Sequence, residues 1–119
     1  MKKLLMALML MPLMALAEME IVDGVMWSYV VANGKATIMS GTTPCVGEMA
    51  VPDTLGGCPV TAIGGDAFSS KNEISKMTLP KGITTIGDYA FASCSSLMAI
   101  NIPGGVTSIG KCAFGIAED

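Results

Sequence analysis

The sequence predicts a mainly β solenoid of about three coils that follows an N-terminal β-hairpin. Each coil is about 23 residues long, and repeats of this length indicate a solenoid. The motif VTAIGGDAF at residues 60–68 recurs as ITTIGDYAF at 83–91 and as VTSIGKCAF at 106–114, with the same spacing each time. An apolar motif ending in proline precedes two of these copies directly and the first copy after an insertion. Upstream, an Asn-Gly pair separates two β-rich runs.

The first seventeen residues have the order of a secretory signal peptide. Two lysines begin the segment, an apolar run follows over 4–16, and residues 15–17 supply a small-x-small cleavage site. This run is short for a membrane span, although an uncleaved anchor helix is the alternative. We assign 1–17 to the signal peptide and expect export, to the medium or the cell surface, with no membrane span after cleavage.

Residues 18–45 are expected to form a cap on the first coil. The Asn-Gly pair at 33–34 is the strongest short signal for a hairpin turn. Trp27, Tyr29 and Val31 alternate on one face of the preceding β-rich run. This face either covers the first coil or presents an aromatic patch to a carbohydrate or protein partner.

Residues 46–119 contain the repeats, the last of them incomplete. The strand motifs VGEMAVP, ISKMTLP and LMAINIP begin at 46, 74 and 97, and the longer first interval includes five extra residues between Pro52 and Val60. One coil cannot bury its own apolar edge, so the coils must stack. Stacking predicts two columns in the repeat core: Ile63, Ile86 and Ile109, and Phe68, Phe91 and Phe114.

The glycine at 87 recurs in each copy, which predicts a sharp bend or a close approach of two backbones. Two positions later the copies differ, with Asp66, Tyr89 and Cys112 at the same place. We therefore expect tolerant surface positions here rather than a catalytic site.

The segments IP, VTSIG, AF and CSSL resemble the BspA-like leucine-rich repeats of bacterial surface proteins, and the resemblance covers residues 46–114. It implies a leucine-rich-repeat solenoid with a parallel strand ladder along one face, and an adhesin-like role in binding a protein or cell surface. It also implies that Cys94 packs inside. Such proteins usually carry more repeats, so the alternative is a truncated fragment with a structural role, or self-association through an uncapped C-terminal end.

Composition argues against several classes of function. The chain has no His and no Arg, and residues 18–119 carry five lysines and ten carboxylates, a net charge of 5 − 10 = −5. Ser-His and Cys-His catalysis needs an imidazole, and nucleic acid rewards clustered cations. The four cysteines are too far apart for paired zinc ligands. We expect no enzyme activity, no cofactor or metal, and no nucleic-acid partner.

Two groups of side chains are candidate sites. Cys45 and Cys58 are candidates for a disulfide around the first strand and its insertion, worth about 3 kcal/mol, and Cys112 is a candidate for linking two chains. The outward positions of the strand motifs form either a solvated ladder or a binding face, and these are Glu48, Ala50, Lys76, Thr78, Ala99 and Asn101.

Overall fold

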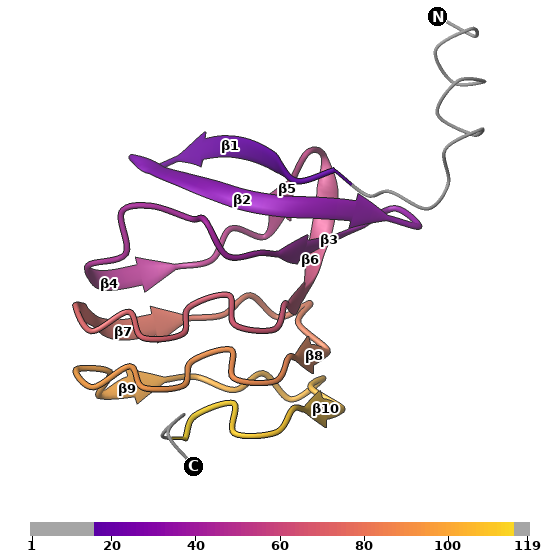
Figure 1. Cartoon of the computed structure of the whole chain (residues 1–119). Helices are drawn as coiled ribbons and strands as arrows, with labels where there is room; N and C mark the ends of the chain where they lie inside the picture. The colour runs from indigo at the N-terminus through magenta and orange to yellow at the C-terminus, as the bar shows by residue number, and fades with distance from the viewer. Residues whose placement is uncertain (1–15, 116–119) are drawn as a thin grey trace, which may run out of the picture.

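The computed structural model describes residues 16–115, which form strands, turns and loops and contain no helix (Figure 1). The predicted signal peptide lies mainly outside these residues. In the described part, no helix has the length and apolar character needed to cross a bilayer. The strands are β1 (Glu18–Val22), β2 (Val25–Ala32), β3 (Lys35–Ile38), β4 (Gly47–Ala50), β5 (Thr54–Leu55), β6 (Cys58–Ile63), β7 (Ile74–Thr78), β8 (Thr85–Ile86), β9 (Ala99–Ile100) and β10 (Ser108–Ile109).

The strands belong to two sheets on opposite sides of the coils (Figure 1). Sheet A has the order β1-β2-β3-β6-β8-β10, with β5 paired to β6, and sheet B has the order β4-β7-β9. In sheet A, β1, β2 and β3 pair antiparallel, whereas β3, β6, β8 and β10 pair parallel, as do all strands of sheet B. The chain passes between the sheets in every coil, which confirms the predicted solenoid.

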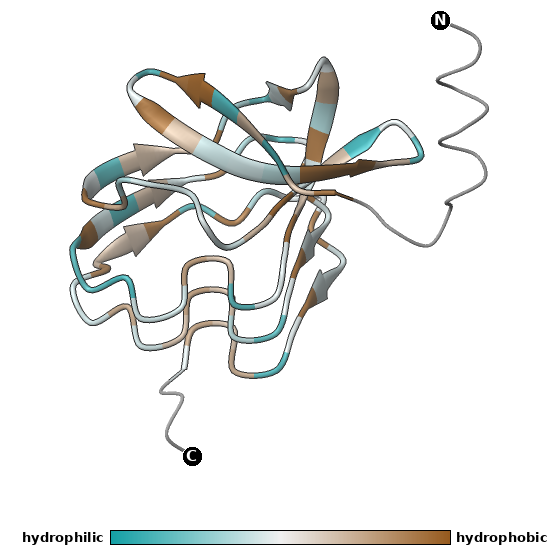
Figure 2. Ribbon diagram, turned by 45° about the horizontal axis from the view of Figure 1, so that its top comes forward, coloured by the Kyte–Doolittle hydropathy of each residue, from teal (hydrophilic) through white to brown (hydrophobic). Residues whose placement is uncertain are grey.

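The strand register reproduces the repeat length. Ile63 pairs with Ile86 and Ile86 with Ile109, and Met77 pairs with Ile100, so each partner is the equivalent residue of the next coil. Figure 2 shows the successive coils following the same path one beside another. Between β4 and β7 the offset is longer, since Met49 pairs with Met77. The five additional residues belong to a hairpin of β5 and β6 that turns at two glycines, residues 56–57, both with positive φ.

The cap consists of two hairpins in sheet A. The Asn-Gly pair at 33–34 connects β2 to β3 with φ of 54° and 74°, as a type I′ turn requires. A second turn, Asp-Gly at 23–24, joins β1 to β2, so the cap has one hairpin more than the sequence predicts. Trp27 and Tyr29 are 2% and 4% exposed, and the Trp27 ring meets Phe68 edge-on, with ring centroids 6.3 Å apart. This face covers the first coil, so the aromatic-patch alternative is wrong.

Both predicted columns run through the interior of the stack. The rings of Phe68 and Phe91 lie 5.3 Å apart and those of Phe91 and Phe114 lie 5.4 Å apart, with interplanar angles of 12° and 1°. Ile63, Ile86, Phe68 and Phe91 are buried. The last members differ from the expectation: Ile109 is 50% and Phe114 is 43% exposed, because among the described residues a coil packs on only one side of them.

Gly87 permits a close approach of two coils rather than a bend. Its φ lies outside the left-handed region, but a Cβ at this position would lie 2.6 Å from the nitrogen of Gly65 and 2.8 Å from the carbonyl carbon of Gly64. The Gly87 amide donates to the Ile63 carbonyl of the preceding coil at 2.8 Å. A side chain would hold the coils apart, so the glycine sets their spacing.

The position two residues after this glycine is more constrained than the sequence suggested. Asp66, Tyr89 and Cys112 have φ of 58°, 59° and 53°, all in the left-handed region. Tyr89 donates its amide to the Lys111 carbonyl at 2.9 Å. Side chains vary here, but each coil requires the same strained backbone, which costs about 1–3 kcal/mol for a residue other than glycine.

Candidate binding face and an unpredicted cavity

Sheet B presents an exposed face along its parallel strands. Side chains alternate on each strand, so Met49 and Met77 point into the core while their neighbours point outward. All members of the candidate face are exposed, namely Glu48, Ala50, Lys76, Thr78, Ala99 and Asn101, with Glu48 and Lys76 at the centre of their strands. Strand pairing brings them together in rows, with Glu48 opposite Lys76, Ala50 opposite Thr78, and Lys76 opposite Ala99.

The chemistry of this face is mixed and its relief is low. Ala50 and Ala99 have no side chain beyond Cβ, so they leave the backbone ladder accessible beside them. Lys76 lies directly across from Glu48 in the strand register, so the two rows carry opposite charges side by side. Parallel strands spaced by about 4.8 Å thus place hydroxyl, ammonium and carboxylate groups on one surface. Such a surface suits hydrogen bonds and ionic contacts to another protein.

Asn101 differs from the other members because its side chain is part of the ladder. The Leu79 amide donates to Asn101 Oδ1 at 2.8 Å, and Asn101 Nδ2 donates to the Leu79 carbonyl at 3.0 Å. One coil earlier, the corresponding bond uses backbone alone, from the Val51 amide to the Thr78 carbonyl. The side chain replaces the backbone after the end of β9. Ile102, the next residue along the chain, is 43% exposed.

The described cysteines are thiols. Cys45 donates to the Thr42 carbonyl at 3.1 Å and Cys58 to the Gly56 carbonyl at 3.6 Å. The expected disulfide between Cys45 and Cys58 is therefore not formed in this structure and stays a prediction for the oxidised chain. Cys94 donates to the Phe68 carbonyl at 3.0 Å, and Cys112 is exposed.

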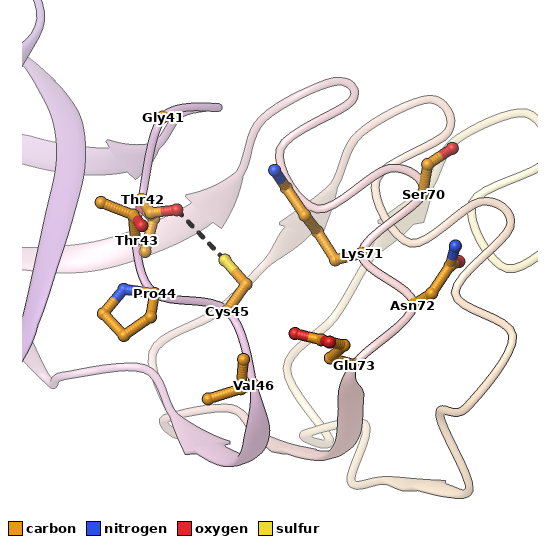
Figure 3. Close-up of a pocket in the computed structure, with 10 residues that line it drawn as sticks. All are labelled: Gly41, Thr42, Thr43, Pro44, Cys45, Val46, Ser70, Lys71, Asn72 and Glu73. Atoms are coloured by element: carbon orange, nitrogen blue, oxygen red, sulfur yellow. Dashed lines mark hydrogen bonds between the residues drawn. The ribbon is translucent and has the colours of Figure 1, made fainter.

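A cavity of about 610 Å³ lies between the loops 41–46 and 70–73 of successive coils (Figure 3). Its walls include the Cys45 thiol, the Lys71 ammonium and the Glu73 carboxylate. The repeat pattern does not predict this cavity, and its one sequence signal is that Lys71 stands where the next coil has Cys94. Within residues 16–115, three or more His, Cys, Asp or Glu side chains nowhere gather in a geometry that could hold a metal ion.

Comparison with known proteins gives one family. The family model described as BspA type leucine rich repeat region (6 copies) matches residues 55–117. No curated protein matches the chain.

Solved structures of leucine-rich repeat proteins share the fold. The chain is similar to a leucine rich cell surface protein of Faecalibacterium prausnitzii A2-165, with 26% identity, a TM-score of 0.68, and coverage of 82% of this chain and 27% of the other. It is also similar to a leucine-rich repeat protein of Bacteroides capillosus ATCC 29799, with 28% identity, a TM-score of 0.65, and coverage of 81% and 73%. The T. pallidum leucine rich repeat protein, at 24% identity and a TM-score of 0.66, shares the fold over 70% of this chain and 39% of its own.

The chain thus spans well under half the length of two of these three relatives. The family model nevertheless matches more than half of the chain, and the match covers the stacked coils with their regular strand register. The chain therefore belongs to the BspA-type leucine-rich repeat family.

Proposed function

We propose that this chain is an exported, adhesin-like binding module that attaches to a protein partner at the bacterial cell surface through the exposed face of sheet B. The observation that carries this proposal is the ordered set of outward side chains on β4, β7 and β9 above a buried inner face. Membership of a leucine-rich repeat family favours protein–protein interaction, and one similar protein is described as a cell surface protein. Binding, without catalysis, is the proposed activity.

The middle strand is the best position for a direct contact. Lys76 and Thr78 on β7 belong to a strand that is paired on each side, so its backbone is held in place by β4 and β9. A preorganised surface loses little conformational freedom on binding. Asn101, by contrast, has its side chain bonded to Leu79, and we assign it to the support of the face.

The binding test compares two charge reversals. Lys76→Glu changes the face, whereas Lys81→Glu makes the same change at an exposed loop position outside it. We expect Lys76→Glu to weaken attachment of the purified protein to intact cells or extracellular proteins by at least about tenfold, since close charge pairs at interfaces couple by about 1.5–7 kcal/mol and about 1.4 kcal/mol is a factor of ten in affinity. Lys81→Glu should bind like wild type. Equal binding by the two variants would refute this use of the face.

The export part of the proposal has a separate test. When the chain is expressed with its N-terminus in a bacterium, we expect the exported protein to begin at Glu18, after the cleavage site at residues 15–17. Cell fractionation followed by mass spectrometry of the N-terminal peptide measures this. Retention of residues 1–17 on protein that stays in the cytoplasm would contradict it.

A second candidate role is self-association. On the last coil that the structure describes, four large apolar side chains are 87%, 43%, 50% and 43% exposed, namely Met98, Ile102, Ile109 and Phe114. Large apolar side chains exposed at one end of the stack favour contact with another protein surface. We expect sedimentation velocity to show a concentration-dependent dimer that Phe114→Ser weakens, and Cys112→Ser tests whether a disulfide contributes. A monomer at all concentrations would exclude this role.

A further inference from the structure

The cavity between the loops 41–46 and 70–73 is closed on one side by backbone. The Gly47 amide donates to the Glu73 carbonyl at 2.7 Å, and the register between β4 and β7 shifts directly after this residue. The loops separate beyond that bond and leave a volume of about 610 Å³. This volume is within the range of small-molecule sites, about 300–1,000 Å³.

One wall of the cavity carries a thiol. Cys45 is half-buried, and its Sγ donates to the Thr42 carbonyl at 3.1 Å, the bond drawn in Figure 3. Burial raises the pKa of this thiol, the Lys71 ammonium acts in the opposite direction, and the Cys94 thiol raises the pKa further. The thiol is therefore protonated at neutral pH, and the supply of thiolate for reaction increases with pH.

The facing wall carries two opposite charges. Lys71 and Glu73 come from the same loop, on either side of Asn72, and in Figure 3 both side chains extend toward the loop that holds Cys45. An ammonium and a carboxylate so placed complement a ligand that bears a carboxylate and an ammonium on one carbon. This is the head group of a free amino acid.

The thiol and the two charges select one class of ligand together. We propose that the cavity binds the amino-acid head group of a small disulfide, of which cystine is the simplest, and that Cys45 exchanges with it to form a mixed disulfide. The Lys71 ammonium would meet the carboxylate of the ligand and the Glu73 carboxylate its ammonium. The reacting sulfur would then face Cys45.

The exchange is balanced without a further oxidant. Cys45 loses its proton to solvent, and the thiolate attacks one sulfur of the small disulfide. The original S–S bond breaks as the new one forms, and the leaving cysteine thiolate takes up a proton. Cys45 is oxidised, and one half of the small disulfide is reduced. The inference depends on the proposed export only for its setting, since small disulfides persist in oxidising compartments.

The test compares two small disulfides at two cysteines of the same molecule. The reduced full chain is incubated with cystine or with the uncharged bis(2-hydroxyethyl) disulfide, and peptide mass spectrometry measures the rate of mixed-disulfide formation at each cysteine. Cys112 is exposed and does not line the cavity, so it is the internal reference. We expect the rate ratio of cystine to the uncharged disulfide to be about 2–30 times larger at Cys45, because each of two exposed charge pairs contributes a factor of about 1.4–5.

Charge-neutral variants decide whether the cavity is responsible. Lys71→Gln and Glu73→Gln should each lower the ratio at Cys45 by about 1.4–5-fold and leave the ratio at Cys112 unchanged, whereas Lys81→Gln should change neither. Circular dichroism of every variant checks the fold. Equal ratios at the two cysteines, or a Cys45 ratio unaffected by both cavity variants, would overturn the inference. Neither result bears on binding by sheet B, which the Lys76→Glu variant measures separately.

Discussion

Replacing Gly87 with alanine tests whether the glycine sets the distance between coils. The added Cβ would lie 2.6 Å from the Gly65 nitrogen, and real Cβ contacts essentially never fall below 3.0 Å. The coil that carries Gly87 must therefore move by a few tenths of an ångström before this contact reaches 3.0 Å. The same movement would lengthen the hydrogen bond from Gly87 to the Ile63 carbonyl from 2.8 Å toward the long end of the normal range, about 3.2 Å.

The size of the effect follows from two opposing contributions. Overpacking of this kind costs about 1–3 kcal/mol, and the next coil must move too, because Gly110 packs closely against Gly87. In the opposite direction, replacing glycine with alanine lowers the conformational entropy of the unfolded chain, which stabilises the folded protein by about 0.4–1 kcal/mol. Gly104→Ala is the matched control, since a Cβ there meets no atom within 4 Å. We expect Gly87→Ala to be less stable than Gly104→Ala by about 1–3 kcal/mol.

Equilibrium unfolding in urea measures this difference. Trp27 is the only tryptophan of the chain and is buried in the cap, so its fluorescence reports the cap and first coil, and circular dichroism reports the strands of all coils. The two signals should agree if the short stack unfolds cooperatively. Free energies of unfolding within about 0.5 kcal/mol of each other for the two variants would refute the role assigned to Gly87.

Three other contacts give separate predictions. Asn101→Ala removes both bonds to the Leu79 backbone and should cost about 1–3 kcal/mol in urea unfolding, with faster amide exchange at Leu79. Phe91→Ala should lower the free energy of unfolding by about 3–5 kcal/mol, and Phe114→Ala by clearly less, because Phe114 is already 43% exposed. Burial and the neighbouring β1 carboxylates raise the pKa of Tyr29 above 10.0. The unfolded chain therefore loses this proton first, and stability should fall as pH rises from 10 through the pKa of the folded state; urea unfolding of Tyr29→Phe should show a smaller loss.

Each of these predictions has its own control. The control for Asn101→Ala is Thr78→Ala. Thr78 is the equivalent residue one coil earlier, where the ladder bond is made by backbone. Equal losses of unfolding free energy for Thr78→Ala and Asn101→Ala would contradict the role of the Asn101 side chain. Equal costs for Phe91→Ala and Phe114→Ala would contradict the exposure argument. For Tyr29→Phe, an alkaline loss identical to that of wild type would assign the loss to other groups, such as the half-buried thiols of Cys45 and Cys94, whose pKa is also raised by burial.

The local pattern of the sequence was sufficient for the repeat unit and for the outward positions of sheet B. Successive side chains of a strand point to opposite faces of the sheet because of the backbone geometry. Since Met49 and Met77 face inward, their neighbours Glu48 and Lys76 must face outward. The same reasoning assigned Asn101 to the surface but gave no sign of its bonds to Leu79. Those bonds depend on where β9 leaves β7, which is decided by contacts between coils.

The sequence by itself determined the length of the coil, the apolar columns and the turn at residues 33–34, because burial and turn geometry repeat with fixed periods along the chain. Only the tertiary structure decided that Gly87 serves a close approach, and that Cys45 faces Lys71 across a cavity. Both features depend on the distances between neighbouring coils. Such distances arise from how whole coils stack, and residues far apart in the sequence share in setting them.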